Sequence, residues 1–295
     1  MSPEPGLVIV DKPGGMTSHD VVARVRRLAG TRKVGHAGTL DPMATGVLVV
    51  GVEKATRLLG YLTLTEKEYA ATIRLGQTTS TDDAEGELTG TAAAQGVTID
   101  AIDQAVAALT GEIGQVPPAV SAIKVGGQRA YKLTRAGAAP ELKARPVNVY
   151  EFTITGIQRV EEPGVMAGLL DLDATVRCSS GTYIRSLARD LGAALGTGGH
   201  LTALRRTRVG GYRAEDARTL DQLAERFEVL PLAQAAAAAF PRRDLTEDEA
   251  GRLAHGGRLP PAGTEGPTAA FAPDGTLIAL VTEESGQTRP LAVFA

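Results

Sequence analysis

The chain has 295 residues, of which 43% are hydrophobic and 22% charged, and its formal net charge is −3. This composition is typical of a soluble globular protein and excludes a disordered chain, a collagen and a disulfide scaffold. The single cysteine, Cys178, cannot form an internal disulfide, which favours a reducing compartment. The start of the chain does not resemble a signal peptide, and no apolar run is long enough to span a bilayer. We therefore expect a cytoplasmic protein with no membrane partner.

The charge is unevenly distributed along the chain. Residues 121–150 hold six Lys or Arg and one acid, and residues 177–213 hold seven Arg and one acid. The rest of the chain must then carry −14. Such a polarised molecule can bind a polyanion on one face, although the whole-chain charge by itself argues against a nucleic-acid binder.

The pattern of apolar residues, glycines and prolines in the first 75 residues predicts alternating strands and helices. Glycines and prolines mark turns, and an apolar period of two or of 3.6 residues indicates a strand or a helix. The pattern predicts a strand at 6–10, a turn at 11–15, a helix at 19–29 capped by Thr17 or Ser18, a structured loop at 31–46, a strand at 47–52, a short helix at 53–60 and a half-buried strand at 67–75.

The remaining elements alternate in the same way. A polar loop follows residue 75, and the segment 115–145 is irregular and basic, which in a compact domain is usually functional or mobile. The pattern predicts helices at 99–110, 181–195 and 246–255, strands at 148–157, 169–177 and 289–295, and a hairpin within 268–282 that turns at Asp274–Gly275.

Several kinds of chemistry find no support in the sequence. The four histidines form no H-x-x-x-H pair, and neither a P-loop nor a G-x-S-x-G elbow occurs. What remains is a carboxylate, Asp41, in the glycine-rich segment 35–42. It could simply begin a turn before Pro42, or it could be held by tight turns as a nucleophile or a general base.

A family resemblance favours the second interpretation. Residues 34–48 (VGHAGTLDPMATGVL) resemble the signature loop of the TruB family of tRNA pseudouridine synthases, and residues 11–18 (DKPGGMTS) resemble the opening motif of that family. Further motifs follow in the family's order: Lys67-Glu68-Tyr69, Arg74-Leu75-Gly76 with the loop ending at Asp83, Gln115-Val116-Pro117-Pro118, Ser121-Ala122-Ile123-Lys124, 178–185 (CSSGTYIR) and Leu204-Arg205-Arg206. The resemblance covers about residues 6–210.

The resemblance implies an α+β pseudouridine synthase fold with a mixed, largely antiparallel sheet flanked by helices. It implies that the chain isomerises uridine 55 in the T-loop of tRNA to pseudouridine after flipping the base out, without a cofactor or a metal. Two alternatives stay open: a tRNA-binding folding chaperone that uses the same contacts, and a related synthase that acts on another RNA.

Roles for individual residues also follow from the resemblance. Asp41 corresponds to the nucleophile, Arg185 to the arginine that pairs with it, and Tyr69 to the aromatic residue that stacks on the target base. His36, Tyr183, Leu204, Asp83, Lys124, Arg205 and Arg206 are implied as substrate-binding residues. Each has a plainer alternative: core packing for Tyr69, Tyr183 and Leu204, a structural histidine, an exposed turn for Asp83, and surface cations. Lys12 is expected to bond beside the loop.

The same resemblance divides the chain. Residues 1–238 correspond to the catalytic domain, with a basic insertion at about 115–145 that clamps the T-arm, and residues 239–295 resemble a small β-rich PUA-like domain. Whether that domain contacts RNA or only adds stability is open. Val120 departs from the family pattern, which often has a tyrosine there, and this puts one RNA contact in doubt. We expect a monomer.

Overall fold

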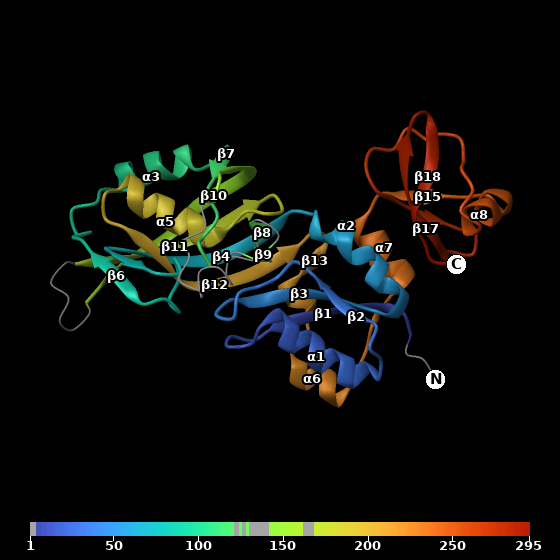
Figure 1. Ribbon diagram of the computed structural model, residues 1–295, viewed down its shortest axis with the longest axis horizontal. Coiled ribbons are helices and arrows are strands. Elements are labelled where there is room, and N and C mark those ends of the chain that lie inside the picture. Colours follow the sequence, from blue (N-terminus) through green and yellow to red (C-terminus); the bar gives the residue numbers. More distant parts are fainter. Residues whose placement is uncertain (1–3, 121–123, 126–127, 130–141, 162–167) are drawn as a thin grey trace. The chain divides into compact units, whose positions relative to one another are not determined.

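The computed structural model describes residues 4–120, 124–125, 128–129, 142–161 and 168–295. The chain packs into two compact units, which are described separately: unit 1 comprises residues 1–65 and 208–295, and unit 2 comprises residues 66–207. Figure 1 shows the elements of both. The predicted boundary at residue 239 lies inside unit 1 and remains a prediction.

Unit 1 begins with a sheet whose strands are buried on both faces. Strand β1 pairs antiparallel with β3 from Gly6↔Val52 to Lys12↔Gly46, β14 pairs with the other edge of β1, and β2 pairs with one end of β3. The elements of this part are β1 (Gly6–Lys12), α1 (Ser18–Ala29), β2 (Val34–Ala37), β3 (Thr45–Val52), η1 (Glu53–Leu58), α2 (Leu59–Thr63), β13 (Tyr212–Arg213), η2 (Ala214–Asp216), α6 (Leu220–Glu225), β14 (Leu230–Pro231) and α7 (Leu232–Ala239).

Alternation along β1 explains why its residues 7–10 (LVIV) form a continuous apolar run before Asp11 and Lys12. Val8 and Val10 pack with α1 and Leu223 on one face, whereas Leu7 packs with η1, α2 and α7 on the other. Successive side chains of a strand point to opposite faces, so a strand covered on both faces has no polar positions.

The C-terminal part of unit 1 is a four-stranded sheet in the order β15-β16-β17-β18, with helix α8 beside it. The predicted hairpin is confirmed: Gly275 has φ +84° and the Asp274 carboxylate accepts a hydrogen bond from the Thr276 amide at 2.9 Å. The elements are β15 (Arg242–Asp244), α8 (Glu247–Ala254), β16 (Thr268–Phe271), β17 (Leu277–Glu284) and β18 (Gln287–Val293).

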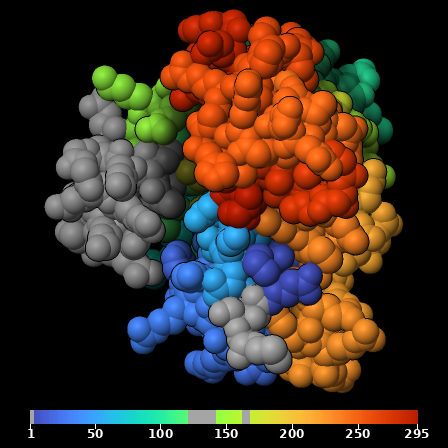
Figure 2. All heavy atoms as spheres, turned by 90° about the vertical axis from the view of Figure 1, so that its right-hand side faces the viewer, coloured from blue at the N-terminus to red at the C-terminus, as the bar shows by residue number. Residues whose placement is uncertain are grey.

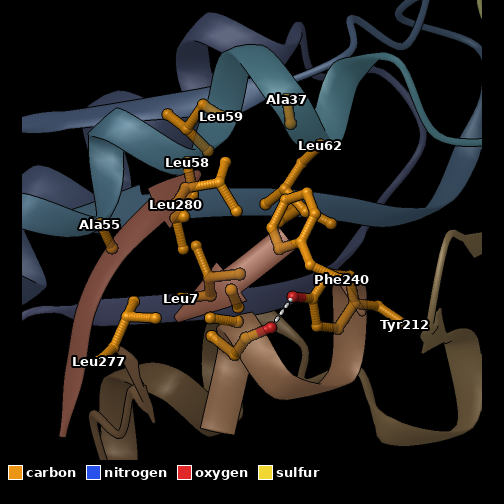
Figure 3. Packing of buried hydrophobic residues seen from close by; sticks show 14 of the residues in the cluster. Leu7, Ala37, Ala55, Leu58, Leu59, Leu62, Tyr212, Phe240, Leu277 and Leu280 are labelled. Atoms are coloured by element: carbon orange, nitrogen blue, oxygen red, sulfur yellow. Dashed lines mark hydrogen bonds between the residues drawn. The ribbon is translucent and has the colours of Figure 1, made fainter. Parts of the chain in front are cut away.

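This C-terminal sheet is also buried on both faces. Ala270 and Val281 pack with Leu253 of α8 in one cluster, whereas Phe271 and Leu280 belong to the cluster that contains Leu7. Figure 3 shows Leu7, Leu58, Phe240 and Leu280 within this shared cluster. In Figure 2 the orange and red C-terminal atoms form one contiguous body that meets the blue atoms of the first part of the chain.

Side chains of η1 also bind the backbone of the last residues. Lys54 Nζ donates to the Phe294 carbonyl at 3.0 Å, and Arg57 donates to the Val293 carbonyl. The C-terminal sheet is therefore joined to the first part of unit 1 by a shared apolar core and by hydrogen bonds.

Unit 2 contains a five-stranded sheet in the order β12-β4-β11-β10-β7. Strand β11 pairs antiparallel with β4 and β10, and β10 with β7. Helices α3 and α5 lie side by side over this sheet (Figure 1). The elements are β4 (Lys67–Leu75), β5 (Gln77–Thr79), β6 (Leu88–Thr91), α3 (Ile99–Ala108), β7 (Gly111–Gln115), β8 (Lys124–Val125), β9 (Gln128–Arg129), β10 (Arg145–Val160), β11 (Leu169–Cys178), α5 (Ile184–Ala194) and β12 (Gly199–Val209).

The predicted α+β class and the largely antiparallel strands are confirmed. The strand at 67–75 has the predicted bounds, and its odd-numbered residues are buried. The structure differs from the predictions in several elements. Strand β2 lies within the segment 31–46 expected to be a loop, β5 lies within the polar loop after residue 75, and the elements not foreseen include β7, β12, β14, α6 and α7. The short strands among them carry weak local patterns and depend on pairing with a neighbouring strand.

Candidate active site

Asp41 lies in a short loop between two paired strands of unit 1. Strand β2 ends at Ala37, opposite Val49 of β3, and residues 38–44 connect them. Gly38 and Gly46 at the two ends of the loop have φ values of +81° and +96°, which favour glycine. Inside the loop the Ala44 amide donates to the Asp41 carbonyl at 3.1 Å. The backbone therefore turns tightly around Asp41. Asp41 itself is half-buried, so its position is partly accessible to solvent.

The last residue of β1 and the turn that follows it bind the backbone of the loop immediately after Asp41. Lys12 is fully buried, and its Nζ donates to the Pro42 carbonyl at 3.1 Å and to the Pro13 carbonyl at 2.8 Å. The Gly15 amide donates to the same Pro42 carbonyl at 2.9 Å. Lys12 therefore lies beside the loop, as expected from the sequence.

Ser18 binds the residue on the other side of Asp41. Its Oγ accepts a hydrogen bond from the Leu40 amide at 2.9 Å and donates to the Leu40 carbonyl at 3.2 Å. Ser18 is buried, and it is the first residue of α1, whose N-cap is Thr17. The sequence analysis treated Ser18 only as a candidate cap. Its position inside the opening motif was the signal that pointed to a role near Asp41.

His36 lies on β2, opposite Val50 of β3. It is half-buried, and its ring meets the ring of His19 on α1 edge to face, with centroids 5.5 Å apart. His19 is exposed, and the sequence analysis did not single it out. The role of His36 in substrate binding remains a prediction.

In unit 2, Arg185 at the start of α5 is held by the loop that contains Asp83. The side chains of both residues are about 95% buried or more, and Arg185 Nη1 lies 3.4 Å from Asp83 Oδ2. The same guanidinium donates to the carbonyls of Thr81 at 2.9 Å and Val120 at 3.0 Å. Asp83 is therefore not an exposed turn residue, and it neutralises a buried arginine.

Val120, which stands where the family often has a tyrosine, accepts one of these hydrogen bonds from Arg185. It does so through its backbone carbonyl, which any residue supplies. The substitution therefore leaves this contact to Arg185 unchanged.

Gln115, the last residue of β7, fixes the beginning of α5. Its buried amide accepts a hydrogen bond from the Tyr183 backbone N–H at 2.8 Å and donates to the Tyr183 carbonyl at 3.1 Å. Tyr183 is the N-cap residue of α5, two positions before Arg185. The sequence motif at 115–118 contained Gln115, but no role was assigned to it.

Tyr69 and Leu204 lie on the strands β4 and β12, and each is 8% exposed. Tyr69 is opposite Val176 of β11. Such burial is compatible with core packing and with the wall of a small pocket, so the predicted contact of these residues with the base remains a prediction.

The Arg205–Arg206 pair separates into two environments. Arg205 is half-buried, whereas Arg206 is only 1% exposed. Arg206 therefore lies in the interior of unit 2, and its predicted contact with the substrate remains a prediction.

Arg206 influences a second buried cation, Lys67. Burial, with the charge of Arg206 as the next cause, lowers the pKa of Lys67 from 10.5 to about 8. Burial likewise raises the pKa of Cys178, opposite Lys67 in β11, to about 11. The sequence analysis noted both residues only within motifs, since burial of a cation leaves no local signal.

Lys124 lies on β8, which forms a small antiparallel hairpin with β9. The rest of the predicted clamp at 115–145 lies largely outside the described residues. Within the described part of the chain, no group of three or more His, Cys, Asp and Glu side chains could hold a metal ion. No described helix is both long enough and apolar enough to cross a membrane.

Family models match almost the whole chain. The model for the TruB family pseudouridylate synthase N-terminal domain matches residues 26–184. The tRNA pseudouridylate synthase B C-terminal domain matches residues 185–233, and the C-terminal model of tRNA pseudouridine synthase II matches residues 240–295.

Similar proteins agree with these matches. The chain is 66% identical over 290 residues to tRNA pseudouridine synthase B of Thermobifida fusca (strain YX), covering 98% of both chains. It is 61% identical over 299 residues to tRNA pseudouridine synthase B of Arthrobacter sp. (strain FB24), covering 98% of this chain and 96% of the relative. A chain in the structure of an H/ACA RNP bound to a substrate RNA containing 2'-deoxyuridine aligns with a TM-score of 0.72 and 26% identity, covering 98% of this chain and 85% of that one.

The loop that carries Asp41 and the Arg185 segment both lie within the residues matched by these models and relatives. The chain therefore belongs to the TruB family of tRNA pseudouridine synthases, which are isomerases.

Proposed function

We propose that this chain isomerises uridine 55 in the T-loop of tRNA to pseudouridine. The observation that carries the proposal is the Asp41 loop, whose backbone is bonded on both sides of Asp41 by Lys12, Gly15 and Ser18. Preorganisation of this kind is what a nucleophilic carboxylate needs, because a positioned group avoids the entropy cost of finding its target. The 66% identity to a relative named tRNA pseudouridine synthase B supports the choice of substrate.

The reaction is an isomerisation that balances without an added group. The N1–C1′ glycosidic bond of the uridine breaks, the base turns, and a C5–C1′ bond forms while the C5 proton is lost and N1 gains a proton. Asp41 acts as the nucleophile and leaves again afterwards, so it is regenerated. Attack at C6 of the ring and attack at C1′ of the ribose are both compatible with a carboxylate.

Other residues would position the uracil base and keep the carboxylate of Asp41 ionised. Tyr69 stacks on the flipped uracil, an interaction worth roughly 1–3 kcal/mol per base. Arg185 keeps the nucleophile ionised and oriented, because a nearby cation favours the charged form of a carboxylate. The remaining predicted substrate-binding residues would complete the contacts with the RNA: His36, Tyr183, Leu204, Asp83, Lys124, Arg205 and Arg206. Flipping costs a few kcal/mol of stacking, which these contacts offset.

The basic segments 121–150 and 177–213 would bind the phosphates of the T-arm and give a salt-dependent affinity. A monomer in the cytoplasm fits this substrate, and the lone, buried Cys178 fits a reducing compartment. The C-terminal sheet would be PUA-like.

The experiment is Asp41→Asn, assayed by tritium release from tRNA that carries 5-tritiated uridine. We expect no release by the variant with tRNA binding intact, whereas Asp221→Asn, a change at an exposed residue of α6, retains wild-type release. Release by Asp41→Asn at the wild-type rate would overturn the assignment of the nucleophile. A wild-type protein that binds tRNA without releasing tritium would instead favour the chaperone.

A base-resolved pseudouridine map of the treated tRNA decides the position. We expect pseudouridine at position 55. Modification elsewhere, or only in another RNA, would identify a synthase with a different substrate.

A further inference from the structure

Two arginines of α5, one helical turn apart, bind the same two segments of unit 2. Arg185 binds the Thr81 carbonyl, the Asp83 carboxylate and the Val120 carbonyl. Arg189 Nη1 lies 3.2 Å from Asp82 Oδ2, and its Nη2 donates to the Val116 carbonyl at 2.7 Å. Consecutive aspartates and both ends of the segment 116–120 are thus bound by one face of the helix.

The backbone at Asp82 makes this double contact possible. Consecutive side chains normally point to opposite sides of an extended chain, so two neighbouring aspartates would not both face one helix. Asp82 has φ +60°, a left-handed conformation that aspartate tolerates better than most residues. Its amide donates to the Thr79 carbonyl at 3.3 Å, and its carbonyl accepts from the Leu201 amide at 3.1 Å. The turn therefore directs both carboxylates to α5.

The Arg189 contact lies nearer the surface than the Arg185 contact. The side chains of Arg189 and Asp82 are 28% and 18% exposed, compared with 5% and 3% for Arg185 and Asp83. Arg189 also bonds Asp190 at 2.9 Å, and the Val116 carbonyl accepts a further bond from Ser186 Oγ at 2.9 Å. Burial raises the pKa of Asp82 and Arg189 opposes that rise, so removal of Arg189 leaves a poorly solvated carboxylate that favours rearrangement of the loop.

We propose that Arg189 is a positioning residue: by holding Asp82 and the Val116 carbonyl on α5, it keeps the loop 81–83 and the segment 116–120 in the places where they orient Arg185. The inference rests on the proposed function, in which Arg185 assists the nucleophile. Because its guanidinium is bound to Asp82, Asp190 and the Val116 carbonyl, Arg189 is set apart from the arginines of 177–213 proposed to bind phosphates, and its effect reaches the reaction only through Arg185.

The test is a set of variants measured by single-turnover tritium release and by tRNA binding. We expect Arg189→Met to lower the rate constant at saturating enzyme about 10-fold, because a small displacement of a reacting group has an effect of this order or larger. We expect the dissociation constant for tRNA to change less than about 2-fold. Arg189→Lys, which keeps the charge, should recover a large part of the rate.

Asp82→Asn tests the partner, since asparagine also tolerates the left-handed conformation. We expect it to reduce the rate, but by no more than Arg189→Met, which also loses the bond to the Val116 carbonyl. We expect the double variant to be no slower than Arg189→Met, because the contact with Asp82 is already absent there. Additive losses would overturn the proposal.

Arg74→Met is the matched control. It breaks an ion pair with Asp171 between β4 and β11, with side chains 22% and 18% exposed, an exposure similar to that of the Arg189–Asp82 pair. We expect it to lower the melting temperature while leaving the single-turnover rate within about 2-fold of wild type. An equal loss of rate in this variant would show that general destabilisation, and not positioning, explains the effect.

The outcomes separate this inference from the proposed function. If Arg189→Met reacts at the wild-type rate, or loses only tRNA affinity, the positioning role of Arg189 is overturned. If Arg185→Met is inactive in the same assays, the assigned role of Arg185 nevertheless stands. If Arg185→Met itself reacts at the wild-type rate, the assigned role of Arg185 fails and the inference fails with it.

Discussion

Ser18 Oγ bonds both polar groups of the Leu40 backbone, at 2.9 Å to the amide and 3.2 Å to the carbonyl. One hydroxyl at the start of α1 thus fixes the residue before Asp41. Both partners are buried, so water cannot replace this contact without a change in the loop.

We expect Ser18→Ala to lower the free energy of unfolding by about 1–3 kcal/mol, because it leaves buried Leu40 groups without their partner. The Asp41 loop should also lose its orientation, so single-turnover pseudouridine formation should slow more than tRNA binding weakens. Urea denaturation and single-turnover assays measure the two effects. Thr17→Ala, which removes the exposed cap of the same helix, is the control for stability, and an equal loss of rate in that variant would contradict the specific role of Ser18.

Gln115→Leu should slow the reaction because it releases the beginning of α5, which carries Arg185. The leucine is of similar size but leaves the Tyr183 amide and carbonyl without the two bonds at 2.8 and 3.1 Å. We expect a loss of about 1–3 kcal/mol in unfolding free energy and a lower single-turnover rate. Circular dichroism melts and tritium release check both, and unchanged values for both would refute the contribution of this amide.

Two helical glycines differ in the space available for a side chain. A Cβ on Gly192 of α5 would lie 2.2 Å from the Gly198 carbonyl carbon and from the Gly199 nitrogen, whereas a Cβ on Gly251 of α8 would meet nothing within 4 Å. We expect Gly192→Ala to cost about 2 kcal/mol or more, and Gly251→Ala to stabilise by about 0.5–1 kcal/mol. Chemical denaturation measures both variants, and stabilisation of both by a similar amount would show that helix propensity alone decides the effect and would contradict the close contact at Gly192.

The lowered pKa of Lys67 should make the free energy of unfolding depend on pH in the alkaline range. The pKa is about 8 in the folded protein and 10.5 in the unfolded chain, so between these pH values the unfolded chain binds more protons than the folded protein does. The cost of the buried charge is fully present below pH 8 and disappears as the pH rises to about 10.5. Relative to Lys67→Met, the wild type should gain up to about 3 kcal/mol over this range.

Denaturant titrations of the wild type and Lys67→Met at pH 7, 8.5 and 10 test this dependence. The difference between the two proteins is the relevant quantity, because tyrosines and exposed lysines titrate equally in both. A difference that stays constant with pH would contradict the lowered pKa.

Leu280 tests whether the C-terminal sheet shares the core of the first 65 residues. It is fully buried in the cluster that contains Leu7 and Leu58 (Figure 3). We expect Leu280→Ala to cost about 2–5 kcal/mol and to lower a single, common unfolding transition. Leu64, which is 69% exposed, is the matched control, and Leu64→Ala should change stability by less than about 0.5 kcal/mol. A separate early transition of the C-terminal part would contradict the shared core.

Local patterns were sufficient where one residue's chemistry decides the conformation. Thr17 caps α1 as predicted, the alternation at 67–75 gives the observed strand, and Asp274–Gly275 forms the predicted turn. The loop that carries Asp41 and the arginine at 185 were identified as candidates through the resemblance of their motifs to the family.

Other features depend on pairing that a local pattern does not reveal. The short strand β2 is stabilised by the nearby β3, and β12 is stabilised by β4, more than 120 residues away in the chain, so their own residues carry little signal. Similarly, nothing near Arg206 in the sequence indicates that it is buried while Arg205 is half-buried.

The sequence by itself determined the division of charge into two basic stretches, and its resemblance to the TruB family indicated the family, the α+β class and the loop around Asp41 as the candidate site. Only the tertiary structure decided that Ser18 and Lys12 bind the backbone beside Asp41, that Asp83 neutralises Arg185, and that Arg189 binds Asp82. The physical reason is that residue type sets which bonds a group can form. Which partner it meets depends on segments that lie far apart in the chain and that only folding brings together, as with Arg189 and Asp82, which are 107 residues apart.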